Sequence, residues 1–181
     1  MKFTPLLLQG VVLVEPMVHE DARGSFWESY RNDLFGKHGI KEEFVQDNQS
    51  FSFKGVLRGL HWQVEPAAQA KLVRVARGEI FDVVVDVRPD SPTFGKWLGE
   101  WLSSKNKKMF YIPPGFAHGF LTLSDEAEVL YKVSAFYSPE HERSLIWNDP
   151  TVGIAWPAVG RELIISDRDR KNPLLKEVGV K

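Results

Sequence analysis

The sequence predicts an all-β protein: an antiparallel β-barrel or jelly roll with a few short helices. Three observations support this fold class. Short apolar runs with period-two alternation recur along the chain, turn-forming clusters separate them, and no segment sustains the 3.6-residue period of a long helix. Barrels and double-sheet jelly rolls show this even spacing of short strands.

The clearest strand is residues 79–88, EIFDVVVDVR, which are rich in β-branched residues. One face carries Phe81, Val83, Val85 and Val87, and the other carries Asp82, Val84 and Asp86. This alternation predicts a half-buried strand. The other expected strands, in chain order, are residues 11–15, 24–30, 43–52, 55–63, 71–78, 97–103, 108–113, 119–124, 128–137 and 144–149, with turn clusters at 20–24, 88–95, 103–107 and 123–126.

Helical signals are few. Residues 31–39 have an Asn/Asp start and a Gly stop, and residues 166–175 are expected to form one or two turns. The apolar N-terminal stretch is interrupted by Pro5, Gln9 and Gly10, so we expect a first strand there rather than a signal peptide or a membrane span.

Length and composition narrow the possible functions. The chain has 181 residues, which fits a single domain over residues 1–181. It contains no cysteine, which excludes disulfides, thiolate nucleophiles and Cys-ligated metals. The formal net charge is −1 and no long basic tract is present, so no nucleic-acid partner is expected. We expect a cytoplasmic protein with no membrane partner.

The stretch GVLRGLHWQ, residues 55–63, places a histidine and an arginine in an otherwise apolar strand. Parity puts Leu57, His61 and Gln63 on one face, and Arg58 on the other. A bulge at Gly59 would bring Arg58 and His61 into one cavity. The alternative is a core histidine bonded to a backbone carbonyl.

A second histidine follows a Pro-Pro-Gly turn in IPPGFAHGF. Pro113, Gly115 and His118 fit the P-x-G-x-x-H motif of the cupin superfamily. The first cupin motif requires H-x-H, whereas here it reads His61-x-Gln63. A firm transition-metal site gathers three or four His or carboxylate ligands, so we expect no metal and no cofactor.

Without a metal, the barrel would act by proton transfer or by binding alone. Proton transfer needs a base, a group that orients it, an opposing acid and a cation for the developing oxyanion. His61 can be the base, and ISDRDR offers Asp167 and Asp169 as orienting carboxylates. The alternative is that the ISDRDR segment is simply a solvent-exposed turn.

Two tyrosines share one face of the expected strand 128–137. In a straight strand the phenols of Tyr131 and Tyr137 would stand about 20 Å apart, a distance that suits the two ends of a nucleotide sugar. Core or rim tyrosines are the alternative. Four basic residues would suit a diphosphate: Arg23, Arg58, Lys71 and Arg168. The alternative is that they are ordinary surface charges.

Five blocks of the chain, at residues 21–30, 44–63, 68–97, 112–142 and 146–157, resemble the dTDP-4-dehydrorhamnose 3,5-epimerase family. The likeness runs in order from about residue 3 to 175. It implies a homodimeric, metal-free, cupin-like jelly roll that inverts carbons 3 and 5 of dTDP-4-dehydro-6-deoxy-D-glucose during dTDP-L-rhamnose synthesis.

The resemblance also implies a role for each site residue. His61 is the proton acceptor, Asp169 rather than Asp167 orients it, and Tyr131 is the proton donor. Lys71 is the candidate for the ketone oxygen, and Tyr137 stacks on thymine. The remaining substrate contacts are Arg23, Glu28, Gln46, Asp47, Asn48, Arg58, His118, Glu142 and Arg168. Arg168 stands where the family commonly has lysine.

Three alternatives remain from the sequence. One is a related epimerase that inverts carbon 5 only, in another deoxysugar pathway. Another is a non-catalytic cupin that binds a nucleotide sugar. The third is a metal-dependent cupin, against which Gln63 argues.

Overall fold

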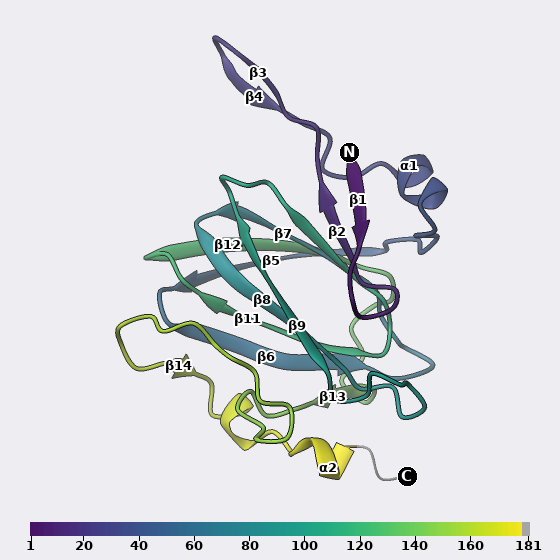
Figure 1. Ribbon diagram of the computed structural model, residues 1–181, viewed down its shortest axis with the longest axis vertical. Coiled ribbons are helices and arrows are strands. Elements are labelled where there is room, and N and C mark those ends of the chain that lie inside the picture. Colours follow the sequence, from purple (N-terminus) through teal and green to yellow (C-terminus); the bar gives the residue numbers. More distant parts are fainter. Residues whose placement is uncertain (179–181) are drawn as a thin grey trace.

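Two antiparallel sheets face each other in the computed structural model, which describes residues 1–178 (Figure 1). This arrangement confirms the predicted all-β class. The first sheet has the order β1 (Lys2–Pro5), β2 (Val12–Glu15), β10 (Met109–Ile112), β7 (Lys71–Arg77), β12 (Glu126–Val133), β5 (Gln46–Phe53). The second has the order β13 (Glu142–Ser144), β6 (Val56–Gln63), β11 (Phe116–Thr122), β8 (Glu79–Asp86), β9 (Trp97–Ser103), and β14 (Ile164–Ile165) pairs with β6 in parallel.

Strand β8 is buried on both faces, so the prediction of a half-buried strand was wrong. Its inward side chains, including Ile80 and Val84, join the core between the sheets. Its outward side chains, including Phe81 and Val83, pack under the C-terminal segment around Trp156. A strand that is covered on both faces has no solvent-exposed face, so it does not need the polar residues that alternate along a half-buried strand.

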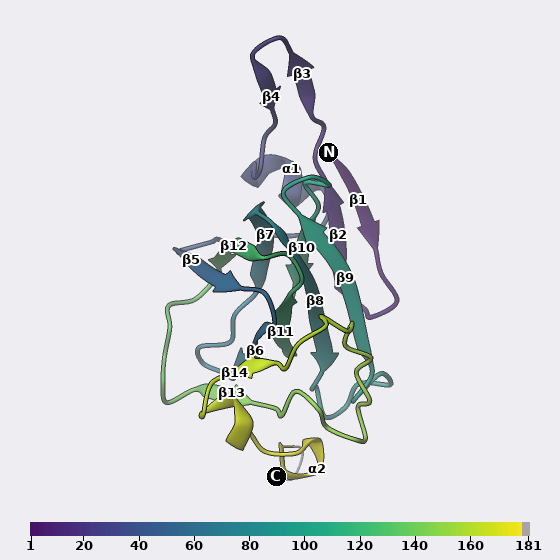
Figure 2. The same ribbon diagram turned by 90° about the vertical axis from the view of Figure 1, so that its left-hand side faces the viewer.

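A two-stranded hairpin formed by β3 (His19–Asp21) and β4 (Gly24–Phe26) projects from the two sheets, at the end opposite α2 (Figures 1 and 2). Gly24 has φ +123°, a conformation that favours glycine at the tip of the turn. The strand expected over 24–30 is therefore confined to Gly24–Phe26.

Helix α1 (Asn32–Lys37) follows the hairpin and lies within the predicted range 31–39. Its Phe35 is fully buried in a cluster with Leu72, Met109 and Tyr111, so the helix covers part of the outer face of the first sheet. Burial of a large apolar side chain of this kind is worth about 2–3 kcal/mol.

The C-terminal segment crosses the second sheet and ends in two short helices, η1 (Asp169–Lys171) and α2 (Leu175–Val178). Of these, η1 lies within the range 166–175 in which one or two turns were predicted, whereas α2 begins only at the last residue of that range. The strand expected over 144–149 was wrong except at Ser144, the last residue of β13 (Glu142–Ser144). After β13, Leu145 and Leu60 exchange two backbone hydrogen bonds of 3.0 and 3.2 Å. No helix among residues 1–178 is long and apolar enough to span a membrane.

Candidate active site

A cavity of about 570 Å³ lies where the two sheets and the segment after β14 converge. A second hollow of about 260 Å³ adjoins it, because His61, Lys71 and Tyr131 line both. The predicted site residues on this lining are Gln46, Asn48, Arg58, His61, Lys71, His118, Tyr131, Tyr137, Glu142, Arg168 and Asp169.

The bulge expected at Gly59 is present, and it brings Arg58 and His61 into the cavity together. Along the β6–β11 pair, His118 lies opposite His61, whereas Phe120 lies opposite Arg58. Two steps along β11 therefore match three along β6, which changes the alternation of side chains. Both Arg58 and His61 line the same cavity.

Gly59 is required by space as well as by conformation. Its φ is +122°, and a Cβ there would lie 2.6 Å from the Cα of Gly119. Its backbone N–H donates a 3.3 Å hydrogen bond to Asp169 Oδ2. The bulge therefore supplies a second donor to the carboxylate that binds His61.

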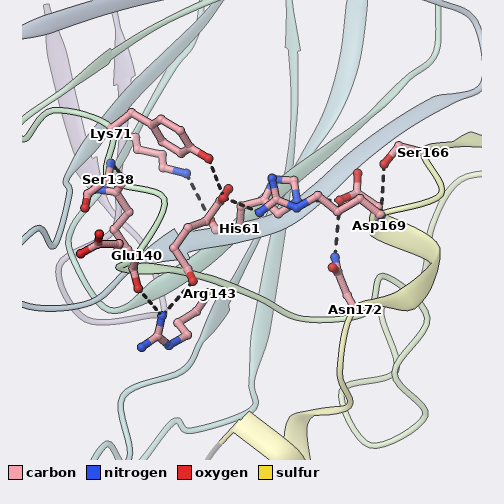
Figure 3. Close-up of polar contacts among 12 residues, drawn as sticks. His61, Lys71, Ser138, Glu140, Arg143, Ser166, Asp169 and Asn172 are labelled. Atoms are coloured by element: carbon pink, nitrogen blue, oxygen red, sulfur yellow. Dashed lines mark hydrogen bonds and ion pairs between the residues drawn. The ribbon is translucent and has the colours of Figure 1, made fainter.

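His61 and Asp169 form a close pair. Nε2 of His61 lies 2.6 Å from Oδ1 of Asp169, whose side chain is only 6% exposed. Figure 3 shows the His61 ring directed toward Asp169, which also bonds Ser166 and Asn172. Burial alone would raise the pKa of Asp169, but the hydrogen bond and charge of His61 outweigh it and lower the pKa. The carboxylate therefore stays ionised and favours the tautomer with its proton on Nε2.

Tyr131 comes from the opposite sheet, on β12, where it pairs with Asn48 of β5. Burial raises the pKa of its phenol, although the positive charge of Arg58 opposes the shift. The phenol is therefore protonated at neutral pH and available as a donor. His61 and Tyr131 thus line the cavity from different sheets.

Lys71 and His118 line the same cavity as His61. The Lys71 Nζ donates to the backbone oxygen of His61 over 3.2 Å. Burial lowers the pKa of Lys71 to about 8, against the attraction of Asp82 and Glu142. His118 Nε2 lies 2.6 Å from Asp82 Oδ1, and burial lowers the pKa of His118 more than Asp82 raises it.

Asp82 is a site residue that the sequence reasoning missed. It is fully buried, and its Oδ2 has no hydrogen-bond partner among the described residues. The sequence did indicate it, because Asp82 is a carboxylate within the apolar strand 79–88. That carboxylate was assigned to the polar face of the strand. A carboxylate at an inward position of a barrel strand needs a partner, which here is His118.

Tyr137 lies beyond the end of β12, because the chain leaves the sheet after Val133. The strand expected over 128–137 was therefore wrong beyond Val133, and the separation of about 20 Å, which assumed a straight strand, no longer applies. Tyr131 and Tyr137 line the same hollow. The Tyr137 hydroxyl donates to Glu142 Oε2 over 2.8 Å, and Arg168 also bonds this oxygen. Burial would raise the pKa of Glu142, but Arg168 and Tyr137 lower it.

Three predicted substrate contacts do not face the cavity of this chain. Arg23 lies on the projecting hairpin, where its 90% exposed side chain pairs with Asp21. Glu28 lies 3.5 Å from Arg31. Asp47 is on the outer face of β5, is 2.9 Å from Lys132, and borders another hollow, of about 330 Å³.

Gln63, which replaces a ligand of the metal cupins, has other partners here. Its amide nitrogen donates to the oxygens of Ala67 and Phe136, and its oxygen accepts from Ser138 N. Within residues 1–178, no three His, Asp or Glu side chains gather in a way that could hold a metal ion.

Comparison with known proteins identifies the family. The model of the dTDP-4-dehydrorhamnose 3,5-epimerase family matches residues 5–177. A protein of that name from Pseudomonas aeruginosa is 53% identical, over 94% of each chain. The crystal structure of a dTDP-6-deoxy-D-glucose 3,5-epimerase from Legionella pneumophila, in complex with dTDP-4-keto-L-rhamnose, is 45% identical with a TM-score of 0.93, covering 97% of this chain and 93% of that one.

A structural neighbour that is named as a monoepimerase shares the fold. A 3′-monoepimerase from Streptomyces bikiniensis, in complex with dTDP-quinovose, is 38% identical with a TM-score of 0.90, covering 96% of this chain and 87% of that one. The full-length family match and the identity of about half over nearly the whole chain are the decisive findings. The chain therefore belongs to the dTDP-4-dehydrorhamnose 3,5-epimerase family of isomerases, which have a cupin-like jelly-roll fold.

Proposed function

We propose that this protein inverts carbons 3 and 5 of dTDP-4-dehydro-6-deoxy-D-glucose to give dTDP-4-dehydro-L-rhamnose, in the cytoplasm, for dTDP-L-rhamnose synthesis. The observation that carries the proposal is that His61, paired with Asp169 of η1, lies on one sheet and Tyr131 on the other, around one cavity. An inversion needs a proton removed from one face of a carbon and returned to the other.

His61 removes the proton from the carbon next to the ketone. Because Nε2 is bonded to Asp169, the base is Nδ1, which has no partner among residues 1–178. The ionised Asp169 stabilises the imidazolium that forms, as the aspartate of a serine-protease triad does. The electron pair of the broken C–H bond moves onto the ketone oxygen to give an enolate.

Lys71 stabilises that enolate oxygen. An imidazole is too weak a base to form an enolate from a ketone unaided, so donors placed on the cavity wall must supply most of the stabilisation. The protonated Lys71, with Arg58 or His118 assisting, meets this need from the cavity wall. Carbons 3 and 5 flank the same carbonyl, so one oxyanion site serves both inversions.

Tyr131 then donates its proton to the opposite face of the carbon, and the enolate electron pair forms the new C–H bond. The enzyme is left with an imidazolium and a phenolate. His61 returns its proton to solvent and Tyr131 takes one from it, which restores the starting state. The raised pKa of Tyr131 favours this recovery.

The nucleotide end lies at the adjoining hollow. Tyr137, 53% exposed at its rim, offers a ring for stacking on thymine, and Gln46 and Asn48 offer amide groups. Arg58 and Arg168 are the diphosphate partners. Arg168 also bonds Glu142, so phosphate binding would compete with this contact.

The working enzyme is a homodimer in this proposal. Arg23 and Glu28 are expected substrate contacts, yet neither lines this chain's cavity, and the hairpin that carries Arg23 projects from the two sheets (Figure 1). The chain also has exposed aromatic side chains. These are Phe26 on the hairpin, and Phe51 and Phe53 on the outer face of the edge strand β5. A second copy would cover such surfaces and could receive the hairpin in its own site.

Mixing two variants tests this arrangement. Arg23→Ala and His61→Asn should each have low activity. If the hairpin acts in its partner's site, a mixed dimer holds one doubly altered site and one intact site. An equal mixture should therefore recover about a quarter of wild-type activity. No recovery after subunit exchange would contradict the shared site.

A single-carbon epimerase is the second candidate, because a 3′-monoepimerase has the same fold. Proton NMR of the product separates the two. Coupling constants that show both carbons inverted support the proposal. Inversion at one carbon supports the second candidate, and binding without turnover supports a non-catalytic protein.

A further inference from the structure

Residues 135–138, which carry Tyr137, belong to no strand. Strand β12 ends at Val133, and the chain then runs along the 260 Å³ hollow. Because this segment pairs with no strand, its backbone groups need other partners. Glutamine side chains supply these partners.

Three glutamines bind four consecutive residues of this segment. We call them the glutamine clamp: Gln46, Gln63 and Gln69. Each comes from a different part of the fold: Gln46 from β5, Gln63 from β6, and Gln69 from the loop before β7. The contacts are Gln69 Nε2 to Ala135 O at 2.6 Å, Gln63 Nε2 to Phe136 O at 3.2 Å, Tyr137 N to Gln46 Oε1 at 3.2 Å, and Ser138 N to Gln63 Oε1 at 2.8 Å.

Gln63 is the centre of the clamp. It is 4% exposed and makes a third contact, from Nε2 to Ala67 O at 2.6 Å. Only an amide combines two N–H donors with a carbonyl acceptor at one end of a side chain. Gln63 thereby joins the 64–70 loop and the 135–138 segment to β6, two residues after His61.

The first cupin motif has a second histidine where this chain has Gln63. Here the side chain holds the segment around Tyr137. Two of the three Gln63 contacts flank Tyr137, at Phe136 O and Ser138 N. The Tyr137 hydroxyl is held separately by Glu142, which pairs with Gln63 across the β6–β13 ladder. Backbone and ring of Tyr137 are therefore both fixed with respect to β6.

We infer that Gln63 is a positioning residue for nucleotide binding, acting through Tyr137. The inference rests on the proposed function, in which Tyr137 stacks on the base. Fixing the segment before substrate arrives removes the ordering cost of the loop from the binding step. Loss of Gln63 should therefore weaken binding of the nucleotide more than it slows proton transfer at the sugar.

The test is a double-mutant cycle on dTDP affinity, measured by calorimetry, with Gln63→Leu, Tyr137→Ala and the double variant. Gln63→Leu should raise the Kd for dTDP and the KM about tenfold or more. Its kcat should stay within about threefold of wild type. In the Tyr137→Ala background, Gln63→Leu should add little, because the group it positions is gone. Gln9 is an exposed glutamine in the turn between β1 and β2. Gln9→Leu is therefore the matched control and should leave the Kd for dTDP unchanged.

A second variant covers the case in which Gln63→Leu does not fold. Gln63→Glu keeps the size and the acceptor for Ser138 N but loses its donors while ionised. Protonation returns one donor, so its dTDP affinity relative to wild type should improve as the pH falls.

Additive effects in the cycle, or a Gln63→Leu variant that loses kcat with unchanged KM and Kd, would overturn the inference while leaving the proposed function standing. A flat ratio of Gln63→Glu to wild-type affinity across pH would also contradict it. Wild-type protein that binds no dTDP would contradict the proposed function and this inference together.

Discussion

Asp169 Oδ1 lies 2.6 Å from His61 Nε2, although 108 positions separate the two residues. The Gly59 N–H and Ser166 hold the same aspartate. In the proposed mechanism this pair leaves Nδ1 as the base, because it holds the proton on Nε2.

Asp169→Asn should lower kcat by about 100-fold or more, because an amide in this place no longer enforces the tautomer or stabilises the imidazolium. Steady-state kinetics measure the loss. Asp167→Asn is the matched control, since Asp167 is exposed two residues earlier. Equal losses in both variants would remove Asp169 from its orienting role.

Activity should fall as the pH rises through about 8, the lowered pKa of Lys71. Only the protonated ammonium can donate to the enolate oxygen, so deprotonation removes the donor on the alkaline side. Lys71→Met should lower kcat by about 100-fold and abolish this alkaline limb. A variant that retains the same alkaline limb would show that another group titrates there.

Tyr131→Phe should separate the two proton transfers. His61 can still form the enolate and exchange a proton with heavy water, whereas return of a proton to the opposite face is lost. We expect solvent exchange to continue while product formation falls about 100-fold. Equal decreases in both rates would exclude Tyr131 as the donor.

Gly59→Ala should destabilise the fold by about 2–4 kcal/mol, because the added Cβ meets Gly119 at a positive φ. Gly160→Ala is the control: Gly160 also has a positive φ, but a Cβ added there would meet nothing within 4 Å. That change should cost about 1 kcal/mol. Urea unfolding of the two variants measures the difference, and similar losses would show that crowding at the bulge is unimportant.

The barrel itself could be predicted, because period-two alternation and turn clusters are local signals. The bulge was also accessible, since Gly59 lies between two polar residues of opposite parity. Burial of β8 on both faces was not, because its outer cover, around Trp156, comes from a segment about seventy positions away. The end of β12 at Val133 was hidden for a similar reason: residues 134–137 continue a strand-like composition, but glutamine side chains take the place of a neighbouring strand.

The site could be predicted only in part. His61, Lys71, Tyr131 and Asp169 do line one cavity, but their meeting depends on register and chain crossing that no local pattern encodes. Asp82 was missed because parity alone does not say which face is inward. Arg23 lies outside this chain's cavity because the hairpin that carries it projects from the two sheets, and no local pattern in the sequence encodes the direction of that hairpin.

Deuterium uptake from heavy water into carbons 3 and 5 of dTDP-4-dehydro-6-deoxy-D-glucose tests the central claim most directly. The wild-type protein should introduce deuterium at both carbons. His61→Asn should introduce it at neither, while still binding dTDP with an affinity close to wild type. Undiminished uptake in His61→Asn would contradict the assignment of His61 as the base.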